Sequence, residues 1–95
     1  MPPIAVPDEF TIHQVRAMTP HLIKLARSGE TLELDLSGVS HIDTAGMQLL
    51  LAVRRESARA RTQLALNNPS PAVSELMSFY QLDRVLGVHV VAARV

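Results

Sequence analysis

The spacing of apolar residues changes several times along the chain, and each change marks a predicted element. Leucine alternates with polar residues from Thr31 to Val39, which is the period of a half-buried strand with Glu33 and Asp35 on its wetter face. From Thr44 to about Arg61 the apolar residues recur every three or four positions, as on one face of a long helix. Shorter runs typical of strands lie at 4–6, 10–12, 62–66 and 88–92.

A further helix is predicted over residues 15–26, ending at Ser28-Gly29. Pro20 lies inside this segment, and an interior proline removes one helical hydrogen bond. Two arrangements are therefore open. Either Thr19 caps a helix that begins at Pro20, or a longer helix runs through Pro20 with a kink.

The last third of the chain predicts a helix with Ser70 as its N-cap and Pro71 in its first turn. One further turn is expected over 82–86. Strands separated by helices need crossover connections, which give parallel neighbours. The pattern predicts one α/β domain over residues 1–95, with a mixed, mostly parallel β-sheet and α-helices packed against it.

Composition narrows the function classes. Hydrophobic residues make up 47% of the chain and aromatic residues only 3%, so the core must be aliphatic. Nine basic residues balance nine acidic ones, and no nucleic acid partner is expected. The absence of cysteine excludes disulfides and Cys-ligated zinc. No leader or long apolar run is evident, so we expect a cytoplasmic protein without direct membrane insertion.

The connection from Ser37 to Gly46 carries the densest group of chemically useful side chains. Asp43 is predicted to cap the long helix by accepting the N–H of Gly46, for roughly 1 kcal/mol. A phosphoryl group on Thr44 would lie at the positive end of the helix dipole. It would also add about two negative charges to this surface.

Catalysis and metal binding are not expected here. Asp43 lacks a second acid, an activated base or a phosphate-cradling glycine loop nearby in the sequence. The four histidines show no metal-ligand spacing, so neither a metal nor another cofactor is expected.

The long helix carries a second apolar stripe beside its core face, formed by Met47, Leu51 and Ala58 and edged by Arg54 and Arg55. An apolar strip with an arginine border is typical of a partner-binding surface. The alternative is that a neighbouring helix of the same domain covers it.

These segments resemble the STAS domain, the module shared by anti-sigma factor antagonists and the cytoplasmic tails of sulfate transporters. The resemblance rests on two consecutive segments, Leu34-Asp35-Leu36-Ser37-Gly38-Val39 and Ile42-Asp43-Thr44-Ala45-Gly46-Met47. Residues 64–70 and 76–84 also match the pattern of the family. It implies a STAS-like fold without enzyme activity, which docks a protein partner through the 37–47 turn and the following helix.

In the antagonist branch, a kinase-like anti-sigma factor binds this turn and phosphorylates the serine just before the glycine, which breaks the complex. Ala45 stands at that position here, so the usual switch lacks its hydroxyl, and Thr44 is the phosphosite that remains. The residues expected to contact the partner are Ser40, His41, Asp43, Thr44, Met47, Leu51, Arg54 and Arg55.

Two other roles within the same family stay open. The Asp-Thr-x-Gly turn is similar to that of small STAS subunits that dock the ATPase subunit of a lipid-trafficking ABC transporter. The sequences of residues 43–51 and 68–73 also resemble those of STAS proteins in chemotaxis-type signalling. We expect the protein to be a monomer or a weak homodimer. An enzyme would need a closed polar pocket around Asp43 and His41.

Overall fold

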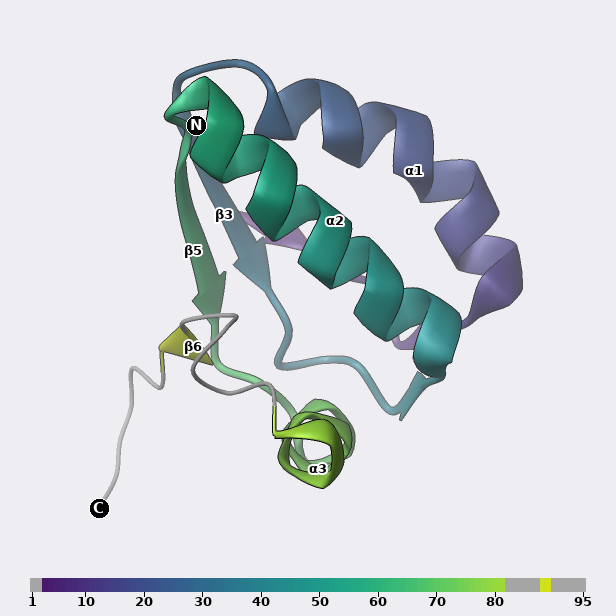
Figure 1. Ribbon diagram of the computed structural model, residues 1–95. Coiled ribbons are helices and arrows are strands. Elements are labelled where there is room, and N and C mark those ends of the chain that lie inside the picture. Colours follow the sequence, from purple (N-terminus) through teal and green to yellow (C-terminus); the bar gives the residue numbers. More distant parts are fainter. Residues whose placement is uncertain (1–2, 82–87, 90–95) are drawn as a thin grey trace.

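The computed structural model describes residues 3–81 and 88–89 (Figure 1). The predicted turn at 82–86 and the part of the last predicted strand beyond His89 lie outside the described residues. The elements, in chain order, are β1 (Ile4–Ala5), β2 (Glu9–Phe10), α1 (Ile12–Ala26), β3 (Thr31–Asp35), β4 (His41–Ile42), α2 (Thr44–Ala60), β5 (Gln63–Asn67), α3 (Pro71–Tyr80) and β6 (Val88–His89).

The described strands pair only in parallel, as the alternation of strands and helices predicts. The larger sheet has the order β1-β3-β5-β6, and β2 pairs with β4 in a separate two-stranded sheet. The α/β class is confirmed. Strand β4 lies inside the predicted connection, and two residues are too few to give a period in the sequence.

Helices α1 and α2 lie side by side over one face of the larger sheet, with the core between the two layers (Figure 1). The alternation of β3 sets this arrangement, because Leu32 and Leu34 are buried while Glu33 and Asp35 are half-buried. The other fully buried large side chains are Phe10, Leu22, Leu36, Val39, Leu50, Val53, Leu66, Val73 and Met77.

Helix α1 runs through Pro20, so the arrangement that begins a helix at that residue is wrong. The helix starts earlier, after Thr11, whose backbone N–H donates to Gln14 Oε1 at 3.2 Å in a capping box. Ile12, expected at the end of a strand, is therefore the first helical residue. The Thr19 hydroxyl does not cap a helix but donates back to the Val15 carbonyl at 2.6 Å.

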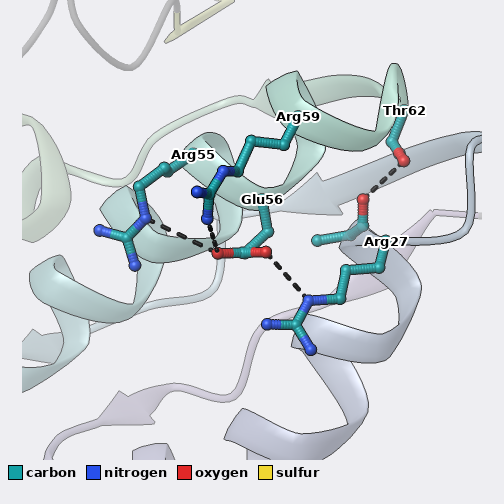
Figure 2. A network of polar contacts seen from close by, with 6 residues as sticks. Arg27, Arg55, Glu56, Arg59 and Thr62 are labelled. Carbon is teal, nitrogen blue, oxygen red and sulfur yellow. Dashed lines mark hydrogen bonds and ion pairs between the residues drawn. The ribbon is translucent and has the colours of Figure 1, made fainter.

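A polar network joins the C-terminal ends of α1 and α2 (Figure 2). Thr62 Oγ1 donates to the Ala26 carbonyl at 2.6 Å and accepts the Gly29 N–H at 2.9 Å. Glu56 accepts from Arg27 Nε at 2.9 Å across the two helices. This hydrogen bond lowers the pKa of Glu56 against the opposing effect of burial, and the charges of Arg27, Arg59 and Arg55 lower it further.

None of the described helices is long and apolar enough to cross a membrane.

Candidate partner-binding site

Asp43 links the N-termini of two helices. Its Oδ1 accepts the Gly46 N–H at 3.0 Å, which confirms the predicted cap of α2. Its Oδ2 accepts the N–H of Ile12, the first residue of α1, at 3.2 Å. A carboxylate is favoured there because both helix dipoles present their positive ends to it. The second bond was not predicted, since Ile12 and Asp43 are 31 residues apart in the sequence.

Gly46 allows the first turn of α2 to lie directly on β2. A Cβ atom at this position would overlap the Phe10 carbonyl oxygen and would lie 2.9 Å from both Ile42 Cγ1 and Phe10 Cδ2. The Asp-Thr-Ala-Gly turn therefore has a structural basis within this chain: the aspartate caps the helix, and the glycine provides the close approach.

Replacing Asp43 with alanine is expected to lower the free energy of unfolding by about 2 kcal/mol, because α2 loses its N-cap and the first N–H of α1 loses its carboxylate acceptor, each worth about 1 kcal/mol. Asp43→Asn keeps one acceptor oxygen and should lose about half as much. Ser70→Ala removes the single cap of α3, in which Ser70 Oγ accepts from the Val73 N–H, and is the matched control. Urea unfolding checks this order, and equal losses in Asp43→Ala and Ser70→Ala would contradict the double cap.

Ser40 and His41 are held by their backbones and leave their side chains exposed. Both N–H groups donate to the Asp8 carbonyl, at 2.8 and 3.0 Å. The two residues line a hollow of about 620 Å³ between β4 and α3, together with Thr11, Ile42, Ala72, Glu75, Leu76 and Phe79. The surface beside Asp43 is therefore mixed, with exposed polar groups next to apolar ones.

A second hollow, of about 300 Å³, lies between the first turns of α2 and the end of α3. It is lined by Thr44, Met47, Gln48, Leu51 and Tyr80. Thr44 is exposed and Leu51 is half-buried. The hydroxyl-bearing residue Thr44 thus lines the same hollow as the apolar residues Met47 and Leu51.

Met47 is not the exposed residue that the second stripe predicted. It is only 2% exposed and belongs to the core, because it lies one turn before Leu50 on the border of the buried face of α2. Its part in this surface is limited to the floor of the hollow. Arg54 and Arg55 are exposed about one turn beyond Leu51.

The sequence analysis missed two aromatic residues at the end of α3. Phe79 is 77% exposed and Tyr80 is 47% exposed, and their rings meet edge to face with centroids 5.0 Å apart. Phe79 lines the first hollow and Tyr80 the second. Two adjacent aromatics in a chain with only three in total were the signal that could have found them.

The carboxylate of Asp43 is occupied by two backbone N–H groups, so its geometry serves folding. Over the described ranges 3–81 and 88–89, no three His, Asp or Glu side chains gather in a way that could hold a metal ion. The arrangement offers an open surface with apolar and hydroxyl groups, which suits protein binding.

Comparisons with known proteins point to one fold. The chain superposes on an anti-sigma-factor antagonist (STAS) domain protein from Planctomyces limnophilus with a TM-score of 0.80 and 16% identity, covering 96% of this chain and 82% of that one. The anti-sigma factor antagonist SpoIIAA in its unphosphorylated form gives 0.75 and 22%, covering 95% and 78%. The murine anion transporter Slc26a9 gives 0.73 and 22%, covering 97% of this chain and 16% of the transporter.

No curated protein sequence matches the chain. The family model described as "Mlab, STAS domain" matches residues 2–90. Because this match spans nearly all of the sequence and the fold agrees with it, the chain belongs to the STAS domain family.

Proposed function

We propose that the chain is a non-enzymatic regulator that docks a kinase-like signalling protein through one surface, the docking face. This face consists of Thr44, Gln48, Leu51, Phe79 and Tyr80. The observation that carries the proposal is the pair of exposed aromatics beside an apolar hollow at the N-terminus of α2. Exposed apolar groups with a polar rim are characteristic of binding surfaces, and aromatics are enriched at their centres.

Thr44 is the proposed control point of this face. It is exposed, it is the first residue of α2, and it lines the same hollow as Leu51 and Tyr80. Phosphorylation would place about two negative charges beside apolar groups that a partner must cover, so the complex would weaken. Ala45 is half-buried and has no hydroxyl, which leaves Thr44 as the acceptor in this turn.

The same docking face supports a second role, as a constitutive subunit that binds the ATPase of a lipid-trafficking ABC transporter. Ala45 favours this role, because a turn without the usual hydroxyl suits a permanent complex. The two roles differ in the partner and in whether Thr44 is modified.

Capture from the source cells followed by incubation with ATP tests the proposal. Tagged wild-type protein should retain a kinase-like partner, and mass spectrometry should find phosphate on Thr44 but none in the Thr44→Val variant. Phosphothreonine should then release the partner. An ATPase subunit retained without any phosphate on Thr44 would support the second role and reject the switch. A partner that binds the Leu51→Asp variant as well as it binds the wild type would reject both proposed roles.

A further inference from the structure

The charges of the chain cancel in sum but are separated in space. Among the described residues, α1, α2 and their C-caps hold seven basic residues and one acidic residue, Glu56, a net charge of +6. Every one of the seven is exposed. They are Arg16, Lys24, Arg27, Arg54, Arg55, Arg59 and Arg61.

The acidic residues lie mostly elsewhere. Glu33 and Asp35 are on the face of β3 turned away from the two helices. Asp43 sits at the helix N-termini, and Glu30 borders the C-terminal end of the helical layer. Although the net charge of the chain is zero, the two helices therefore carry an excess of positive charge. We call five of their exposed residues the basic face: Arg16, Lys24, Arg27, Arg55 and Arg59.

Glu56 arranges the arginines of this face across the junction of α1 and α2. Its side chain is 11% exposed, and it lies 2.9 Å from Arg27 Nε, 3.5 Å from Arg59 and 3.7 Å from Arg55 Nε. In Figure 2 the terminal nitrogens of Arg27 and Arg55 point away from Glu56. The buried carboxylate thus keeps these guanidinium groups together and leaves donors free for an outside anion.

The surroundings of the basic face identify the kind of anion. The two helices lie side by side (Figure 1), so neither stands out to enter a nucleic acid groove. Helices α1 and α2 contain no Phe, Tyr or Trp, the residues that supply the larger stacking surfaces for bases. None of the basic residues lines either hollow, where a protein side chain could insert. What remains is a set of exposed basic side chains, with three guanidinium groups gathered around Glu56, that suits phosphate groups.

We propose that the basic face binds an anionic phospholipid surface peripherally, by charge and without insertion. Basic clusters gain affinity for anionic leaflets with each arginine or lysine near the surface, and the attraction is screened by salt. Phe79 and Tyr80 belong to α3 and not to the two basic helices. Thr44, Gln48 and Leu51 of the docking face lie on α2, so a partner on the docking face and a membrane on the basic face would be neighbours on that helix.

Co-sedimentation with vesicles tests this inference. The full chain should bind vesicles of phosphatidylcholine and phosphatidylglycerol in equal amounts at about 50 mM salt, and should be released at about 500 mM. Pure phosphatidylcholine should not bind it. Arg55→Gln/Arg59→Gln should weaken binding at least roughly tenfold. The control Ser74→Glu/Ser78→Glu makes the same change in net charge at exposed positions of α3 and should bind as wild type.

Three results would overturn the inference. The first is failure to bind the mixed vesicles at low salt. The second is an equal loss in both double variants, which would mean that only net charge matters. The third is an arginine variant that keeps its vesicle affinity but loses binding to a duplex DNA or to an acidic protein partner. Leu51→Ala removes apolar surface from the docking face without adding a charge and should leave vesicle binding unchanged, so this test is independent of the proposed docking face. Circular dichroism confirms that each variant is folded.

Discussion

Gly46→Ala should lower the free energy of unfolding by about 2–4 kcal/mol, far more than the same change at Gly38 in the same connection. In an unobstructed helix the same change would stabilise the protein, because alanine loses less backbone entropy than glycine. Here the added Cβ meets the Phe10 carbonyl oxygen and the side chains of Phe10 and Ile42. Relief would need α2 to move away from β2, which would also stretch the bond that the Ile12 N–H donates to Asp43.

Gly38→Ala is the matched control. It lies in the same connection, and a Cβ atom there would have no neighbour within 4 Å. The free energy of unfolding should change by no more than about 0.5 kcal/mol. Thermal or urea unfolding of the two variants measures the difference. Equal stability would mean that the first turn of α2 does not lie against β2 as described.

The elements that leave a clear local pattern were predictable from the sequence. The 17-residue α2, the β3 alternation and the Ser70 cap of α3 each leave a local signature, and all three are confirmed. The class of fold follows from the order of such elements. The path of α1 through Pro20 depends on a start at Thr11, where the capping box was not recognised.

The features that combine distant segments were not predictable in the same way. The second bond of Asp43 depends on where α1 begins, and β4 exists because its backbone pairs with β2. The burial of Met47 depends on how the core closes around the border of α2. The charge separation was invisible in a zero net charge, since it depends on which elements pack together.

Leu51→Asp should weaken partner binding by roughly 100-fold while leaving the domain folded. Leu51 is half-buried and lines the hollow with Thr44 and Tyr80, so its outer part is available to a partner. A carboxylate there would be desolvated in the complex, and the apolar contact would be lost. Ala17→Asp adds the same charge at an exposed position of α1 and should have no comparable effect.

The most direct test of the docking face is therefore the affinity of the captured partner for three proteins: wild type, Leu51→Asp and Ala17→Asp, each with its unfolding curve. The proposed function predicts a large loss of affinity in Leu51→Asp alone, with both variants unfolding cooperatively. Unfolding of Leu51→Asp would show that this side chain is core and that the face is wrongly assigned. Unchanged affinity in a folded Leu51→Asp would place the partner elsewhere on the domain.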